Sequence, residues 1–157
     1  MAFSIIFYIA WISITAFYAK KKKFSKLENS ALFFCILIIN VNYSWIIYDE
    51  CKFITYSTLP LNYTAYIIYR SIIIPILILM GINSIPRNLT ITKKVIGILI
   101  SSLVLLLIKI VLLKLDVVYF HKWSLIFDYI YFIFLYSFGY FVLYCYHSLI
   151  LKGEKIK

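Results

Sequence analysis

Charged residues lie inside three of the long apolar segments of this chain. Arg70 lies about seven residues into the apolar segment 63–82, and Asp128 lies near the start of the segment 125–151. Inside a membrane-spanning helix a charge is expensive, so such side chains pair with one another or mark a functional site. We therefore predict an ion pair between Arg70 and Asp128 that joins the two segments. The alternatives are that Arg70 extends to the membrane interface or binds a ligand or an ion.

A wider polar cluster is predicted around this pair. Lys109 lies in the outer part of the segment 95–113, where its long side chain is expected to reach the interface or to compete with Arg70 for Asp128. Three residues after this point belong to the same predicted outer polar cluster, namely Lys114, Asp116 and His121. Because positive charge exceeds negative charge in this set, the cluster could receive an anionic group.

Amide side chains lie inside a second apolar segment, 31–48. Asn40 and Asn42 are at lipid depth there, with Ser44 close by. At this depth an amide commonly hydrogen-bonds to a neighbouring helix, which contributes about 0.6–2 kcal/mol. We predict that Asn40 and Asn42 make interhelical contacts, and a polar pathway is the alternative.

The segment that carries Arg70 also contains a proline. Pro75 cannot donate a backbone hydrogen bond, and its ring clashes with the preceding helical turn. A kink is therefore predicted in this segment, with either a packing or a gating role.

Composition indicates the kind of element that must position these residues. Hydrophobic residues make up 64% of the 157 residues, against about 45–50% in soluble domains. Five apolar segments, at about 3–19, 31–48, 63–82, 95–113 and 125–151, approach the length of about 20 residues that spans a bilayer core. They are continuously apolar rather than alternating, which favours helices over barrel strands. We predict an all-α fold, a single transmembrane domain of five helices over 1–157.

The distribution of basic residues predicts the orientation of these spans. One side is expected to carry eleven: Lys20, Lys21, Lys22, Lys23, Lys26, Arg87, Lys93, Lys94, Lys152, Lys155 and Lys157. The other side is expected to carry five: Lys52, Arg70, Lys109, Lys114 and Lys122. Basic loops stay in the cytoplasm, so the N-terminus is predicted outside and the C-terminus inside. The net charge of +10 is thus expected to interact with the anionic surface of the lipid bilayer, and no nucleic acid is expected as a partner.

Signals for catalysis and for metal binding are lacking in the sequence. Cys35 and Cys145 lie inside apolar segments and Cys51 lies in a loop, which does not fit a disulfide framework. No zinc spacing, hydrolase motif or phosphate-binding loop occurs. We expect a protein that is not an enzyme and has no cofactor.

The layout resembles a family of small five-span transmembrane proteins of unknown function from spore-forming Firmicutes. The likeness rests on Tyr8-Ile9-Ala10-Trp11 in the first span and the lysine run after it, on Trp45, on the proline of the third span and on Lys122-Trp123. The chain differs from that family in having Lys109 where an acid is usual, and in a last span rich in Tyr and Phe. The resemblance implies a bacterial plasma membrane.

The expected role is a non-enzymatic accessory or assembly subunit that binds other membrane proteins or itself. Small and polar residues could supply the contacts, namely Asn40, Asn42, Ser101, Ser102 and Gly139. One alternative is a small oligomeric transporter or channel that uses the outer polar cluster. Another is a membrane sensor or immunity-type protein that binds through the loops around Cys51 and Trp123. A common cavity for Arg70, Asp128 and Asn40 would favour the transporter, whereas contacts with neighbouring helices would favour the accessory subunit.

Overall fold

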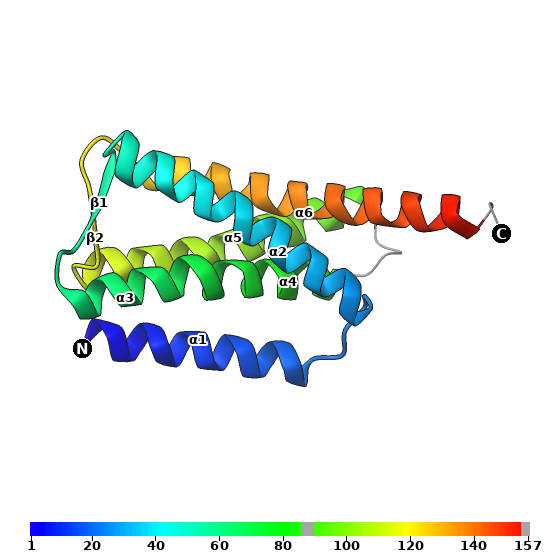
Figure 1. The fold of residues 1–157 in the computed structure, drawn as a ribbon, viewed down its shortest axis with the longest axis horizontal. Helices are drawn as coiled ribbons and strands as arrows, with labels where there is room; N and C mark the ends of the chain where they lie inside the picture. Colours follow the sequence, from blue (N-terminus) through cyan, green and yellow to red (C-terminus); the bar gives the residue numbers. More distant parts are fainter. Residues whose placement is uncertain (86–89, 155–157) are drawn as a thin grey trace.

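A computed structural model describes residues 1–85 and 90–154 of the chain (Figure 1). The prediction of five helices long and apolar enough to cross a membrane is confirmed. Two of the spans contain a π-helical turn. The elements are α1 (Ala2–Ala19), α2 (Lys26–Ser44) with η1 (Trp45–Glu50), α3 (Pro60–Ile68) with η2 (Tyr69–Ile73) and α4 (Ile74–Ser84), α5 (Ile91–Lys114) and α6 (Leu125–Glu154).

Local capping explains why two spans begin earlier than their apolar segments. Ser25 accepts a hydrogen bond from the backbone N–H of Glu28, whose carboxylate accepts one from the Ser25 N–H. This capping box starts α2 at Lys26 rather than at residue 31. The third span starts at Pro60, since a proline suits the first turn of a helix.

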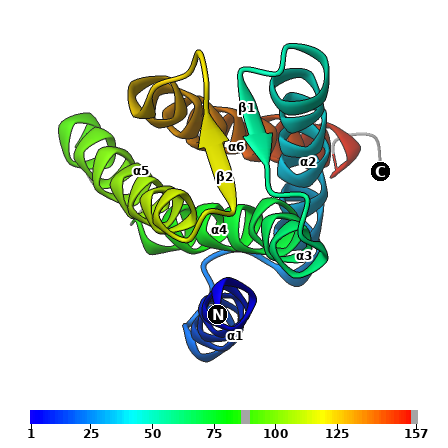
Figure 2. The ribbon, with the colours of Figure 1, turned by 90° about the vertical axis from the view of Figure 1, so that its left-hand side faces the viewer.

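The third span, α3–η2–α4, is the core of the bundle. Of its most apolar 18-residue window 61% is buried, against 22% to 28% for the other four spans. Viewed from one end of the molecule, α4 lies between α5 and α2, and α1 packs on the outside (Figure 2). Most side chains on the third span therefore face other helices rather than the outside of the bundle.

The proline of this span follows a π-helical turn rather than interrupting a continuous α-helix. The N–H of Ile74 donates to the carbonyl of Tyr69, five residues earlier. Pro75, the next residue, has no N–H to donate. The regular α-helical hydrogen bonding thus ends immediately before the proline, and the π-helical turn η2 replaces it there.

A glycine allows α6 to pack closely on the core. A Cβ added at Gly139 would lie 2.6 Å from the Cδ1 atom of Ile82, too close for two carbon atoms. Tyr136 packs similarly against Gly81, and its hydroxyl donates to the carbonyl of Leu77 at 3.2 Å. Small residues bring membrane helices together in this way.

The two loops at one end of the bundle form a short antiparallel sheet, which the all-α prediction did not include. Strand β1 (Ile54–Tyr56) pairs with β2 (Val118–Phe120), with Thr55 opposite Tyr119. Both strands consist of β-branched and aromatic residues, which favour extended structure. The sheet lies across this end of the helices (Figure 2). It is called the end sheet below.

The opposite end of the bundle is fixed by Asn83 at the end of α4. Its side-chain oxygen accepts from the N–H of Lys23 at 3.1 Å, and its amide donates to Asn29 at 2.8 Å. Lys20 also donates to the Ser84 hydroxyl at 2.6 Å. The lysine run after α1 therefore lies at the end opposite the end sheet, beside the C-terminus of α4.

Candidate functional site

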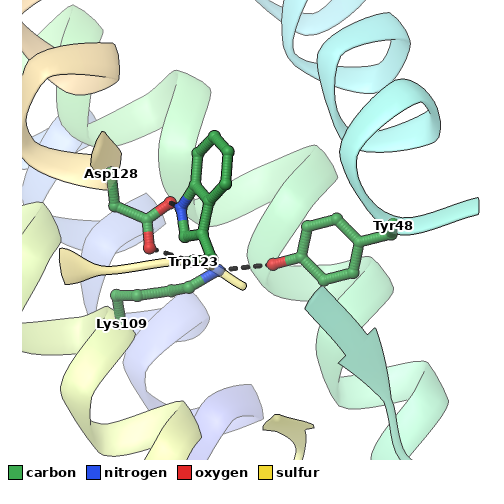
Figure 3. Close-up of polar contacts among 4 residues, drawn as sticks. All are labelled: Tyr48, Lys109, Trp123 and Asp128. Atoms are coloured by element: carbon green, nitrogen blue, oxygen red, sulfur yellow. Dashed lines mark hydrogen bonds and ion pairs between the residues drawn. The ribbon is translucent and has the colours of Figure 1, made fainter. Parts of the chain in front are cut away.

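A buried ion pair joins α5 to α6 near the end sheet. The Lys109 ammonium lies 3.8 Å from a carboxylate oxygen of Asp128, and each residue is only 3% exposed. The other carboxylate oxygen accepts from the indole N–H of Trp123 at 3.2 Å (Figure 3). The structure thus pairs Asp128 with Lys109, whereas Arg70 was the expected partner. Of the two expectations for Lys109, the structure agrees with the second: it does not extend to the interface but points into the bundle, where it takes Asp128 as its partner in place of Arg70.

Aromatic rings surround the ammonium of Lys109. It donates a hydrogen bond to the Tyr48 hydroxyl and lies 5.1 Å from the centre of that ring (Figure 3). The rings of Phe120 and Tyr69 lie 5.6 Å and 6.0 Å from it. Cation–π attraction at these distances helps to offset the loss of water around the charge. Phe120 belongs to the end sheet, so the sheet covers this side of the ion pair.

Arg70 is close to this cluster but has no acidic partner among the described residues. Its guanidinium carbon lies 5.5 Å from the ring centre of Tyr66, and its Nε has no hydrogen-bond partner there. The residue is half-buried. A stacked guanidinium keeps its in-plane donors available, so Arg70 presents an unpaired positive charge.

Asn40 hydrogen-bonds to two other spans and so connects three spans near the ion pair. Its amide nitrogen donates to the backbone carbonyl of Arg70 at 2.7 Å, and its oxygen accepts from the Tyr131 hydroxyl at 3.0 Å. The Arg70 carbonyl is free because Ile74 donates to Tyr69 instead and Pro75 has no N–H. Asn42, the other expected interhelical residue, is exposed and donates to the Ile38 carbonyl of its own helix at 2.7 Å.

The polar side chains of four spans line a common cavity of about 20 Å³. Its lining includes Asn40, Arg70, Lys109 and Asp128 together with five tyrosines: Tyr43, Tyr48, Tyr66, Tyr69 and Tyr131. Four lining atoms are buried without a hydrogen-bond partner among the described residues: the hydroxyls of Tyr66 and Tyr69, Nε of Arg70 and Oδ2 of Asp128. Buried polar groups normally have partners, so this cavity can hold a polar guest. We call these lining residues the buried polar site.

The other members of the predicted outer polar cluster do not line this cavity. Lys114, Asp116 and His121 are exposed at the end sheet. A ring nitrogen of His121 lies 2.9 Å from the Thr55 hydroxyl, across the two strands. The predicted cluster is therefore divided into a buried part on the helices and an exposed part on the loops.

A polar contact joins the end sheet to η1. The Tyr56 hydroxyl donates to the carboxylate of Asp49 at 2.8 Å. This hydrogen bond, together with burial and the nearby negative charge, raises the pKa of Tyr56 above its ordinary value. Strand β1 is thus attached both to strand β2 and to the end of the second span.

The tyrosines and Trp123 were not predicted as members of the site. A signal for some of them exists in the sequence, because Asn40, Ser44 and Tyr48 recur every four residues and so lie on one face of a helix. Asp128 and Tyr131 have the corresponding spacing of three on the last span. Polar residues at helical spacing within apolar segments are the pattern that reveals an interior polar face.

Comparison of the chain with models of protein families, with curated proteins and with solved structures found no match.

Proposed function

We propose that this chain is a non-enzymatic, multi-pass protein of a bacterial plasma membrane that moves a small ion through its buried polar site. The proposal is supported chiefly by one observation: Asn40, Arg70, Lys109 and Asp128, from four different spans, line the same cavity. Polar and charged side chains inside membrane spans commonly mark ion pathways. Five helices enclose little space, so the proposed transporter or channel works as an oligomer.

The orientation is part of the same proposal. The loop after α1, which carries the lysines at positions 20–23, lies at the end opposite the end sheet (Figure 1). We infer that this end faces the cytoplasm, following the rule that basic loops stay inside. The N-terminus and the end sheet then face outward. The bacterial membrane rests on the resemblance to the five-span family, and Arg87, Lys155 and Lys157, which belong to the predicted inner set, lie outside the described residues.

Flux through proteoliposomes tests the transport function. Purified full-length protein is reconstituted, and movement of chloride, potassium and protons is followed with three separate dyes. We expect one of these ions to move faster than in protein-free liposomes, and Arg70→Gln, which removes a charge from the cavity lining, to change the rate of that movement about tenfold. Lys114→Gln, which removes an exposed charge from the end of α5, is the matched control and should leave the rate unchanged. No flux of any of the three ions would overturn the transport function.

An accessory or assembly subunit is the second candidate, and one observation favours it. An apolar groove of about 370 Å³ lies between α1 and the third span, wide enough to receive a side chain of a partner helix. Against it, three of the residues expected to contact a partner are used inside the chain, since Asn40, Ser102 and Gly139 are all buried. Crosslinking in native membranes, followed by mass spectrometry, separates the two functions. A stoichiometric second protein would favour the subunit.

A further inference from the structure

We propose that the buried polar site binds a small monovalent anion, with Arg70 and the hydroxyls of Tyr66 and Tyr69 as its ligands. This inference rests on the proposed function and deepens it by naming the class of ion. The charges of the lining residues, their free hydrogen-bonding atoms and the size of the cavity all support it.

The cavity has an excess of positive charge. Two cations, Arg70 and Lys109, line the cavity with one acid, Asp128. The acid already has Lys109 at 3.8 Å, which leaves the charge of Arg70 without compensation among the described residues. Arg70 is half-buried, so its guanidinium loses part of its contact with water, and a partner of opposite sign compensates that loss. A bound anion supplies that partner.

The free hydrogen-bonding atoms are mostly donors. The hydroxyls of Tyr66 and Tyr69 and the Nε of Arg70 can each donate to a guest, and all three lack a partner among the described residues. Tyr66 and Tyr69 are 2% and 3% exposed, so water outside the protein does not reach their hydroxyls freely. The free acceptor, Oδ2 of Asp128, faces the Lys109 ammonium. A cation could use the hydroxyl oxygens, but it would lie beside the uncompensated charge of Arg70, whereas an anion finds three donors and a charge of opposite sign.

Size narrows the class of anion. The cavity of about 20 Å³ admits a single water-sized guest. A halide approaches that size, whereas sulfate, phosphate or an organic acid does not fit without a larger opening. Four of the lining tyrosines are buried, namely Tyr48, Tyr66, Tyr69 and Tyr131. Few water molecules can therefore accompany a bound ion into the cavity. We therefore expect chloride and bromide to bind and sulfate and gluconate to be excluded.

Chloride NMR on the full-length protein in detergent tests the proposal. Chloride that exchanges with a protein site shows a broadened resonance, and bromide that competes for the site narrows it again. We expect saturable broadening with the wild-type protein, reversed by bromide and not by gluconate or sulfate. Broadening that does not saturate, or that gluconate reverses equally, would overturn the proposal.

Two variants locate the site and one serves as the control. Arg70→Gln removes the unpaired charge and Tyr69→Phe removes a single hydroxyl, and each is expected to weaken chloride binding about tenfold or more, the usual effect of losing a hydrogen bond to a charged partner. Lys114→Gln removes an equal charge from an exposed position and should bind as the wild type does. Should Arg70→Gln fail to fold, Tyr69→Phe still decides, because unchanged binding in that variant contradicts the proposed ligand set.

Failure of this inference is distinguishable from failure of the transport function. Chloride binding in detergent without any flux in liposomes would support the anion site and contradict the transport function. Potassium or proton flux without saturable chloride binding would support the transport function and contradict the anion site.

Discussion

The side-chain amide of Asn40 donates to the backbone carbonyl of Arg70 at 2.7 Å. That carbonyl is free because the π-helical turn η2 redirects Ile74 to Tyr69 and Pro75 has no N–H. The backbone carbonyl that the π-helical turn of the third span leaves unpaired is therefore hydrogen-bonded by a polar side chain of the second span. The same residue that holds the irregular turn also reaches α6 through Tyr131, so the buried polar site depends on it.

Replacing Asn40 by Ala should destabilise the protein. The variant leaves the Arg70 carbonyl and the Tyr131 hydroxyl without their partner, and we expect a loss of about 1–3 kcal/mol in the free energy of unfolding. The measurement is equilibrium unfolding in mixed detergent micelles. Asn42→Ala is the matched control, since Asn42 is exposed and bonds within its own helix, and it should change stability by less than about 0.5 kcal/mol. Equal losses in the two variants would contradict this account.

Pro75→Ala should weaken the coupling between Asn40 and the third span. Alanine restores a backbone donor, which lets the helix return to regular pairing and occupy carbonyls of η2. In a double-mutant cycle we therefore expect Asn40→Ala to cost less in the Pro75→Ala protein than in the wild type, with a coupling of about 0.5–1 kcal/mol. Additive losses would show that the proline and the amide act independently.

Removing one partner of the Lys109–Asp128 pair should be far more harmful than removing both. Lys109→Met leaves Asp128 as a buried charge, and we expect a loss of about 3–5 kcal/mol. The double variant Lys109→Met with Asp128→Leu should recover most of this loss, because apolar residues of similar size replace a buried pair at little cost. The double variant is expected to be folded and yet inactive in the flux assay. A double variant that is no more stable than Lys109→Met alone would contradict the pairing.

The exposed cysteine at the end sheet reports the orientation. Cys51 is exposed, whereas Cys35 and Cys145 are half-buried within spans. A maleimide that cannot cross membranes should label intact bacterial cells expressing the chain, and Cys51→Ser should abolish that labelling. Labelling seen only after the cells are opened would place the end sheet inside and reverse the proposed orientation.

A disulfide across the end sheet should test whether it covers an entrance. Thr55 lies opposite Tyr119 in the pairing of the two strands, and directly opposed residues are close enough for a disulfide after small adjustments. Thr55→Cys with Tyr119→Cys should crosslink under mild oxidation and lower ion flux, which a reductant should restore. Thr58→Cys with Tyr119→Cys, outside the paired region, is the control and should not crosslink. Flux that is unaffected by the crosslink would place the entrance elsewhere.

The number and place of the helices could be predicted from the sequence, but the ion pair could not. Apolar length alone identifies five spans. The depth of Arg70 and Asp128 along their helices was also evident, but depth says nothing about which side of a helix a residue occupies. Lys109 lies on α5, which packs directly on α6, and that adjacency decided the partner of Asp128. The end sheet could not be predicted, because its two strands are only three residues long and about 60 residues apart in the sequence. Strands this short have no recognisable alternation of apolar and polar residues.

The place of the buried acid on the last helix has a consequence for biogenesis. Ribosomes make a chain from its N-terminus onward, so Arg70 and Lys109 are synthesised before Asp128. Until α6 is made, Lys109 lacks the carboxylate that pairs with it in the folded protein. In the proposed membrane topology, α5 and α6 therefore acquire their buried ion pair only when both helices are in place, which makes this contact a late step of folding.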